Sequence, residues 1–276
     1  MIHVAGFSGG KDSTAVTLWL REQGIEHRTV FCDTGWEHPI TYDFVRELDA
    51  KLGLNVEWLK SEKYPDGFEQ MCVARKMVPG MRSRFCTEEL KIFPLHRWIE
   101  AQEDDVTVYQ GVRAQESLAR SKMPRRVFEN AAGGYWIERP LFDWTHEQVF
   151  EIHKRHGIEP NPLYKLGMTR VGCAPCIMVN KRELRQWALR FPEIREKVEK
   201  LEAAIADVNP DSVFFHASYI PERFMRTKEM TTKDGRRVRL PTAGEVFDYV
   251  TEIDREQLNL IDEPPAQCLS VYNLCE

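Results

Sequence analysis

The chain has 276 residues, of which 42% are hydrophobic, 11% aromatic and 29% charged, the composition of a globular protein with a packed core. Its 43 acidic and 38 basic residues give a net charge of −5, so no overall basic excess draws it to nucleic acid or to an anionic membrane. These values exclude a disordered, a collagen-like and a small disulfide-rich secreted chain. No apolar run approaches the ~20 residues of a membrane-crossing helix and no leader sequence is evident. We therefore expect a cytoplasmic protein with no membrane partner.

The first part of the chain alternates short apolar runs with helical patterns. Residues 2–7 predict a strand, the glycines that follow predict a turn, and the apolar spacing from Ala15 to Leu20 predicts a helix. Further strands are predicted at residues 28–32, 55–59, 106–110 and 135–137, and helices at residues 39–52, 88–101, 147–155 and 181–207, the last interrupted near Pro192. Strands that alternate with helices predict a doubly wound, mostly parallel α/β sheet, which binds ligands beyond the carboxyl ends of its strands.

The pattern weakens after residue 210. Residues 231–235 are polar and predict a turn between two short strands. We therefore expect residues 1–210 to form the main α/β domain and residues 211–276 to form a small C-terminal appendage packed on it.

A glycine-containing segment, SGGKDS at residues 8–13, lies between the first predicted strand and the first predicted helix. Glycines there let backbone N–H groups close around a phosphate, the start of the helix adds a favourable dipole, and Lys11 adds a positive charge. Glycine turns also join strands to helices without binding anything. The common nucleoside-triphosphate loop, G-x-x-x-x-G-K-[ST], is not matched, because Ala5 replaces its first glycine and Asp12 its Ser or Thr.

The same segment contains every fixed position of the SGGxDS motif of the ATP pyrophosphatases, or PP-loop enzymes, and the chain resembles that superfamily. Further strings resemble one branch of it, the phosphoadenylyl-sulfate (PAPS) reductase-like proteins, in the family's order and over about residues 3–195. They are Asp33-Thr34-Gly35 with Pro39 and Thr41; Arg84-Phe85-Cys86 with Leu90, Lys91 and Pro94; Gly111-Val112-Arg113 with Glu116, Ser117 and Arg120; Pro140-Leu141 with Asp143-Trp144; and Asn161-Pro162-Leu163-Tyr164 with Gly167, Arg170 and Gly172-Cys173. The resemblance implies an adenine nucleotide alpha-hydrolase-like fold and an enzyme.

The resemblance also implies the site residues, although each string taken alone equally fits a turn, a strand end or a surface ion pair. Lys11, Asp12 and Ser13 are the expected catalytic residues. At the ligand edge of the sheet, Asp33 suits Mg²⁺ or a ribose hydroxyl, and arginines suit anionic oxygens. The expected nucleotide-binding residues are Ser8, Gly9, Gly10, Lys11, Asp12, Ser13, Asp33, Thr34, Gly111, Arg113 and Arg120, with Arg84 and Lys91 as further candidates for anion binding.

Seven cysteines in a chain without an export signal favour metal binding, catalysis or burial over a disulfide framework. Cys173 and Cys176 form a C-x-x-C pair, whose thiolates can hold one metal or form a redox pair. In many relatives such a pair belongs to a [4Fe–4S] site with a third ligand where Cys86 stands. A fourth ligand would come from Cys268 or Cys275, and we favour Cys268. Zinc is the alternative metal, and a metal-free protein the other alternative.

Two further cysteines and a histidine are expected to lie outside the site. Cys32 and Cys72 are interpreted as small buried apolar residues. His153 shows no ligand spacing with an acidic partner, and we assign it no role.

We therefore predict an ATP-dependent adenylating enzyme that uses ATP with Mg²⁺, releases AMP and pyrophosphate, and acts in sulfur transfer or modification of a nucleotide or nucleic acid. Reductases of activated sulfate carry a degenerate loop, whereas this chain keeps the complete one. Two basic stretches are candidates for contact with a nucleic acid, although such runs are usually solvated faces. They are Arg120, Lys122, Arg125 and Arg126, and Lys233, Arg236, Arg237 and Arg239.

Two alternatives remain. The first is a reductase that converts adenylyl sulfate or PAPS into sulfite; against it, Leu274 and Glu276 replace the Glu and Gly that flank the nucleophilic cysteine of reductases. The second is a non-catalytic nucleotide-binding module of a larger assembly. The sequence is compatible with a homodimer or a larger complex.

Overall fold

The computed structural model describes residues 1–252 apart from residues 82, 227 and 233. The described chain divides into two compact units. The first, called the sheet unit, comprises residues 1–65 and 87–173, and the second, called the helical unit, comprises residues 66–86 and 174–252. The domain boundary at residue 210 that the sequence favours stays a prediction.

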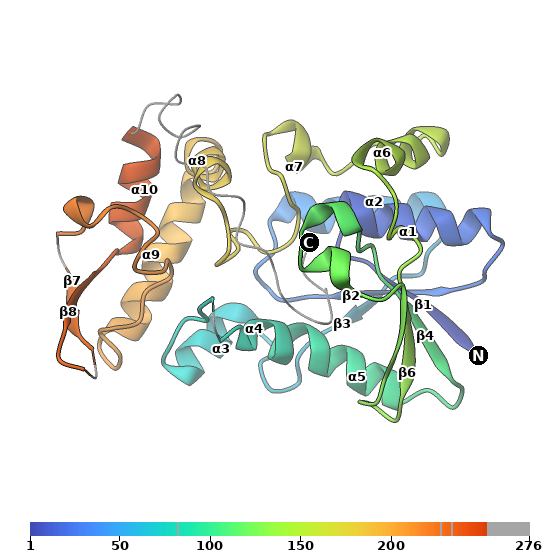
Figure 1. Ribbon diagram of the computed structural model, residues 1–276, viewed down its shortest axis with the longest axis horizontal. Coiled ribbons are helices and arrows are strands. Elements are labelled where there is room, and N and C mark those ends of the chain that lie inside the picture. Colours follow the sequence, from blue (N-terminus) through green and yellow to red (C-terminus); the bar gives the residue numbers. More distant parts are fainter. Residues whose placement is uncertain (82, 227, 233, 253–276) are drawn as a thin grey trace. The chain divides into compact units, whose positions relative to one another are not determined.

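The sheet unit contains a six-stranded sheet with the strand order β3-β2-β1-β4-β6-β5 (Figure 1). Neighbouring strands run parallel except for β5, which is antiparallel to β6. The strands are β1 (Ile2–Gly6), β2 (Arg28–Cys32), β3 (Glu57–Leu59), β4 (Val106–Tyr109), β5 (Arg126–Glu129) and β6 (Tyr135–Glu138). The winding reverses between β1 and β4, and such a switch point is where doubly wound sheets bind ligands. The predicted α/β fold is confirmed, and β5 is a strand that the sequence analysis did not predict.

The helices of the sheet unit follow the predicted pattern except at residues 85–92 and at residues 162–165, where a short helix was not predicted. They are α1 (Lys11–Glu22), α2 (Pro39–Leu52), α5 (Phe93–Glu100), α6 (His146–Arg155) and α7 (Pro162–Lys165), with short 3₁₀ turns at Ala114–Glu116 and Arg120–Lys122. The bounds of α2 are those predicted, because Pro39 suits the first turn and His38 Nδ1 accepts a hydrogen bond from the Ile40 N–H at 3.2 Å. The helix expected at residues 88–101 instead opens with α4 (Phe85–Thr87) and a π-helical turn at Glu88–Ile92. Such turns are frequent at functional sites.

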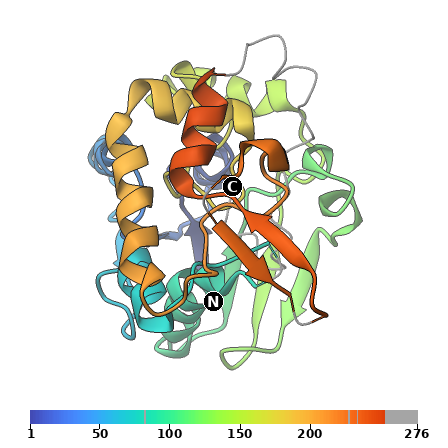
Figure 2. The same ribbon diagram turned by 90° about the vertical axis from the view of Figure 1, so that its left-hand side faces the viewer.

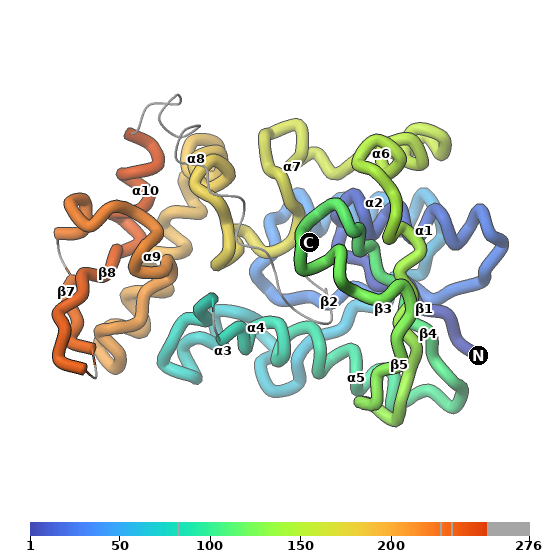
Figure 3. The backbone as a smooth tube through the Cα atoms, viewed as in Figure 1, coloured from blue at the N-terminus to red at the C-terminus, as the bar shows by residue number. Residues whose placement is uncertain are grey.

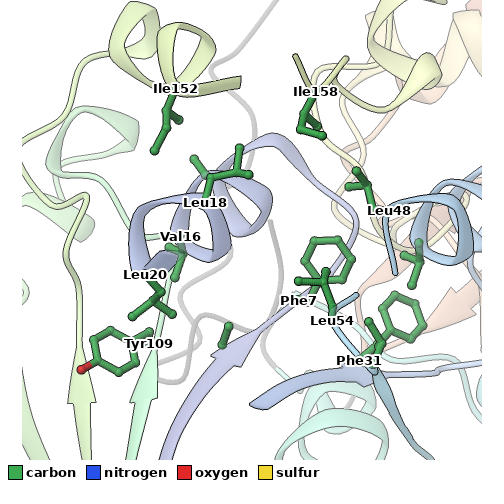
Figure 4. Packing of buried hydrophobic residues seen from close by; sticks show 14 of the residues in the cluster. Phe7, Val16, Leu18, Leu20, Phe31, Leu48, Leu54, Tyr109, Ile152 and Ile158 are labelled. Atoms are coloured by element: carbon green, nitrogen blue, oxygen red, sulfur yellow. The ribbon is translucent and has the colours of Figure 1, made fainter. Parts of the chain in front are cut away.

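Helices cover both faces of the sheet because successive strand residues point to opposite sides. On one face Phe31 and Tyr109 belong to a buried cluster with side chains of α1, α2 and α6 (Figure 4). On the other face Val30 and Val108 pack with side chains of α5. The carboxyl edge of the sheet is thereby held between two packed layers, which gives the loops at that edge a rigid base.

The helical unit is built mainly from helices and one hairpin. Its elements are α3 (Phe68–Arg75), α8 (Lys181–Arg190), α9 (Pro192–Ala206), a 3₁₀ turn at Glu222–Phe224, β7 (Lys228–Thr231), β8 (Arg237–Leu240) and α10 (Ala243–Glu252). The predicted interruption near Pro192 is confirmed, since this proline begins α9. The two short strands expected around residues 231–235 pair as an antiparallel hairpin, and α10 was not predicted (Figure 2). No helix in the part of the chain that the structure describes combines the length and apolar character needed to cross a membrane.

Candidate functional site

The glycine loop joins β1 to α1 at the carboxyl edge of the sheet, where the backbone trace can be followed in Figure 3. Gly9 has a φ of +76°, and a Cβ at this position would lie 3.1 Å from Val45 Cγ2, so both backbone and packing require glycine. Two hydroxyls close the loop across the start of α1. Ser8 N donates to Ser13 Oγ at 3.2 Å, and the Oγ atoms of Ser8 and Ser13 lie 3.1 Å apart.

A cavity of ≈ 50 Å³ lies beside this loop. One water molecule occupies about 10–15 Å³ of such a cavity volume. The cavity therefore has room for a small anion such as phosphate but not for a whole nucleotide. Its polar wall consists of Ser8, Ser13, Glu37, Lys91, Gln110 and Arg120, together with Cys32 and the backbone of Gly111 and Gly172. Lys91 and Arg120 are the cations of this wall and Glu37 is its carboxylate, and Arg120 is also ion-paired with Glu116 outside the wall. A negatively charged occupant would compete with Glu116 for Arg120.

Three charged residues form a buried network behind the loop. Asp12 is fully buried, its Oδ2 lies 2.5 Å from Lys11 Nζ, and its Oδ1 accepts from Arg113 Nε at 2.7 Å. Burial by itself would raise the pKa of the Asp12 carboxyl, but the charges of Lys11 and Arg113 outweigh burial and hold that pKa below its ordinary value. A Cβ on Gly111 would lie 2.7 Å from the carbonyl carbon of Asp12, so only glycine allows this approach. The ionised Asp12 therefore fixes the first turn of α1.

Three side chains from residues 153–164 hold the loop from another side. His153 Nε2 donates to the Lys11 carbonyl at 2.8 Å, Asn161 Nδ2 donates to the Gly9 carbonyl at 3.3 Å, and Tyr164 Oη accepts from the Lys11 N–H at 3.0 Å. Burial is the main cause that lowers the pKa of His153, which favours a neutral imidazole at pH 7. The expectation that His153 has no role was wrong in structural terms, because its ring supports the loop.

Asp33 and Thr34 lie at the end of β2, in a hydrogen-bond network that positions the carboxylate of Glu37. Glu37 was not among the predicted site residues. Thr34 Oγ1 donates to Glu37 Oε1 at 2.6 Å, and the Tyr42 hydroxyl lies 2.7 Å from Asp33 Oδ1 and 3.0 Å from Glu37 Oε2. Burial, followed by the charges of Glu37 and Asp33, raises the pKa of Tyr42. Asp33 also pairs with Lys60 at 3.2 Å. The network directs Glu37 to the cavity wall.

The structure therefore separates the expected nucleotide-binding residues into groups. Those on the cavity wall are Ser8, Ser13, Gly111 and Arg120, those in the loop are Gly9 and Gly10, and those in the supporting networks are Lys11, Asp12, Arg113, Asp33 and Thr34. Their roles in binding and catalysis stay predictions.

The expectation that Cys32 is simply buried was wrong. It is only half-buried and lines the cavity, because β2 ends there, and its Sγ lies 3.6 Å from the Lys91 carbonyl oxygen.

The cysteines expected to bind a metal form no disulfide where the structure describes them. Cys86, Cys173 and Cys176 are half-buried, and Cys173 Sγ lies 3.7 Å from Thr34 Oγ1. Cys268 lies outside the described residues. Within the described ranges, no three His, Cys, Asp or Glu side chains gather as a group that could hold a metal ion. The four-cysteine site therefore stays a prediction. Cys72 is fully buried, as expected, and burial raises the pKa of its thiol.

Together, these features define a doubly wound α/β protein whose glycine loop, at the carboxyl end of its first strand, borders a small cavity with a cationic wall. The family model of the phosphoadenosine phosphosulfate reductase domain matches residues 2–179. The chain belongs to this family, which confirms the resemblance drawn from its motifs.

Known relatives agree with this assignment. An uncharacterized 37.8 kDa protein of Escherichia phage 186 is 33% identical over 282 residues, with 84% of each chain covered. The adenosine 5′-phosphosulfate reductase of Allochromatium vinosum is 28% identical over 172 residues, or 60% of this chain and 64% of the enzyme, so this chain spans less than two thirds of that enzyme. A crystal structure of PAPS reductase from Candida auris in a phosphate complex matches with a TM-score of 0.50 at 21% identity, over 63% of this chain and 81% of that chain. The last likeness concerns the fold alone.

Proposed function

We propose that the chain is an ATP-dependent adenylating enzyme, which transfers AMP from ATP to an acceptor and releases pyrophosphate. The observation that carries this proposal is the complete SGGKDS loop. Its Ser8 and Ser13 line a cavity that Lys91 and Arg120 also line. By this loop the chain resembles the members of its superfamily that hydrolyse ATP.

In the proposed reaction, the loop binds the pyrophosphate end of ATP. The hydroxyls of Ser8 and Ser13 and the backbone amides of Gly9 and Gly10 would contact phosphate oxygens, while the remainder of the nucleotide extends beyond the ≈ 50 Å³ cavity. An acceptor oxygen loses its proton and forms a bond to the α phosphorus. The bond from the α phosphorus to the bridging oxygen breaks, and pyrophosphate leaves with that electron pair. Catalysis rests on positioning and on neutralisation of charge.

Lys11 contributes to this reaction only if its ammonium group leaves Asp12. Its ammonium lies 2.5 Å from Asp12, so contact with a phosphate oxygen requires that it exchange this carboxylate for the nucleotide. Glu37 is the carboxylate on the cavity wall, and carboxylate oxygens are ligands that Mg²⁺ accepts. Glu37 and the phosphate oxygens would hold Mg²⁺, which would neutralise part of the charge on the departing pyrophosphate.

The test is to incubate the full-length protein with ATP and Mg²⁺, with and without nucleotide and nucleic-acid acceptors, and to measure AMP and pyrophosphate. Both products should form together, and Ser13→Ala should slow their formation at least tenfold. Ser121→Ala, which removes an exposed hydroxyl outside the cavity wall, should have no effect. ATP that binds but is not cleaved with any acceptor would contradict the enzyme and support a non-catalytic module.

A second function is favoured by relatives that are named adenosine 5′-phosphosulfate and phosphoadenosine 5′-phosphosulfate reductases. In that reaction two thiols are oxidised to a disulfide as the sulfate group of the adenylyl sulfate is reduced and released as sulfite. It requires no ATP. Sulfite release from either adenylyl sulfate with a thiol donor, in the absence of ATP, would replace the adenylation proposal with this one.

Separately, we propose that Cys86, Cys173, Cys176 and Cys268 bind a [4Fe–4S] cluster. The support is their residue type, because thiolates are the usual ligands of such clusters, with zinc as the competing metal. No step of the adenylation passes through this group. Anaerobically purified protein should be coloured and contain iron, Cys173→Ala should remove the colour, and Cys32→Ala should retain it. A colourless, metal-free protein would end this proposal.

A further inference from the structure

A second cavity, of ≈ 1010 Å³, lies within the helical unit, and we propose that it is a binding groove for single-stranded nucleic acid. It is lined by residues 217–225, by β8 and by Tyr249 and Glu252 of α10; the hairpin and α10 are shown in orange and red in Figure 2. The volume is at the upper limit of pockets for drug-sized ligands, about 300–1,000 Å³. An extended ligand therefore fits it better than one small molecule does.

The first observation is the charge of the groove. Four cations line it, Lys181, Arg223, Arg237 and Arg239, against two carboxylates, Glu222 and Glu252, in a chain whose net charge is −5. Within the described residues, Lys181, Arg223 and Arg237 form no ion pair. Arg239 lies 3.3 Å from Glu229, with about half of each side chain exposed, and exposed pairs of this kind contribute little stability. The cations of the groove thus remain available to an anionic ligand.

The second observation is the spacing of two of these cations. Arg237 and Arg239 are two residues apart on β8, so their side chains lie on the same face of the hairpin and are separated by about 7 Å along the strand. In the register of the hairpin, Thr231 is opposite Arg237 and Glu229 is opposite Arg239. A row of cations along a strand suits a ligand with regularly repeated anionic groups. A nucleic-acid backbone is such a ligand.

The third observation is the aromatic side chains among the cations. The rings of Phe224 and Tyr249 lie 4.9 Å apart in an edge-on arrangement, and the Tyr219 hydroxyl is anchored on the Val179 carbonyl at 3.0 Å. Arg223 Cζ lies 5.0 Å from the Phe224 ring centroid, and Lys181 Nζ lies 5.7 Å from that of Tyr219. All three rings line the groove. Tyr219 and Tyr249 are only 4% exposed and support the groove from below, so the half-buried Phe224 is the ring of the three that a base can reach.

Cations that follow a backbone, combined with rings that stack on bases, are the usual means of binding single-stranded nucleic acid. A duplex keeps its bases stacked inside and leaves the rings without a partner. An acidic peptide satisfies the cations but supplies no planar bases. The single strand is the ligand that uses both sets of side chains. This inference rests on the proposed function, because the groove would hold the nucleic acid that accepts AMP. Binding of the nucleic acid itself requires no ATP.

The test measures fluorescence anisotropy of labelled oligonucleotides of about 20 nucleotides, single-stranded DNA in one arm and single-stranded RNA in the other, with the full-length protein. Arg223→Glu and Arg237→Glu should each weaken binding about tenfold. Each should reduce the slope of log affinity against log salt by about 0.7, the value for one lost phosphate contact. Arg190→Glu is the matched control, because it makes the same charge change at an exposed position of α8 outside the groove, and it should bind as the wild type does.

The Phe224→Leu variant tests the contribution of this aromatic ring without altering the charge of the groove. It should weaken binding several-fold and leave the salt slope unchanged, because it removes only stacking. Circular dichroism verifies that each variant is folded. Binding of either DNA or RNA with these effects supports the groove.

Four results would overturn the inference: no binding of a single strand at low salt, a duplex of the same sequence bound as tightly, competition by polyglutamate as strong as by unlabelled single strand, or an equal loss in Arg190→Glu and Arg237→Glu. Measurement of AMP and pyrophosphate released from ATP by the same variants separates this inference from the proposed function. Single-strand binding lost in the groove variants, together with an absence of ATP cleavage, would retain the groove and reject the adenylation.

Discussion

The cations near the two cavities differ in burial and in ion pairing. Beside the small one, Lys11 and Arg113 are buried and share the carboxylate of Asp12. Beside the large one, Arg237 and Arg239 are exposed, and the pairing of Arg239 is weak. Buried charges must be paired, because an uncompensated charge away from water is costly, so they fix one geometry of the loop. Exposed charges keep their water and can exchange it for a ligand. The buried charges near the small cavity are therefore suited to positioning the glycine loop. The exposed cations of the groove are suited to recognising an anionic ligand.

The strongest test of this contrast removes one carboxylate from each unit. Asp12→Ala should destabilise the protein by about 3–5 kcal/mol, because it removes the buried carboxylate that pairs with both Lys11 and Arg113 and leaves Arg113 with Glu116 at 3.9 Å. Asp248→Ala breaks a pair with Arg195 at 2.6 Å in which Asp248 is 54% exposed, and it should cost about 0–1 kcal/mol. Urea unfolding of both variants measures the difference. Equal losses would show that burial does not distinguish the two kinds of ion pair.

A second test changes one glycine in each unit. Gly111→Ala places a Cβ 2.7 Å from the carbonyl carbon of Asp12, so the loop must shift. It should cost about 1–3 kcal/mol and weaken the binding of inorganic phosphate measured by calorimetry. Gly80→Ala, whose added Cβ has no neighbour within 4 Å, should change stability by less than about 0.5 kcal/mol. Unaltered phosphate binding in Gly111→Ala would contradict the close approach.

A smaller effect is expected from one hydroxyl. Tyr164→Phe removes the acceptor of the Lys11 N–H and should cost about 0.5–1.5 kcal/mol. Hydrogen exchange of the Lys11 amide should become faster in this variant. Tyr249→Phe, in the groove, is the matched change and should leave that amide unaffected. Unchanged exchange in Tyr164→Phe would show that the hydroxyl does not hold the loop.

The smallest effect concerns pH. Burial lowers the pKa of His153 below its ordinary value of 6.5, so near pH 6 the unfolded chain binds a proton that the folded chain does not. Stability is therefore lost as the pH falls through 6.5. His153→Gln removes this dependence, and its stability relative to the wild type should improve between pH 7.5 and pH 5.5. Asp12 does not titrate in that window, because its pKa lies below 3.8. A difference between the two proteins that is constant with pH would contradict the buried neutral imidazole.

Several elements could be predicted from local patterns alone. The bounds of α2, the break at Pro192 and the turn between β7 and β8 follow from proline, glycine and polar signals within a few residues of each element. The order of strands and helices likewise predicted the α/β sheet, and the motif strings identified the family that the comparison confirms. Local signals were weaker for the short strand β5 and for α10, which were not predicted.

The supporting side chains of the loop were decided by tertiary structure. His153, Asn161 and Tyr164 reach the loop from 142, 152 and 153 residues away, and no periodicity connects positions so far apart. The sequence by itself determined that a glycine loop follows the first strand and that Lys11 and Asp12 stand in it. Only the folded chain decided that these two charges are buried against Arg113 while Glu37, Lys91 and Arg120 line the cavity. The physical reason is that the local pattern sets backbone conformation, whereas the burial of a charge depends on which distant segments pack against it.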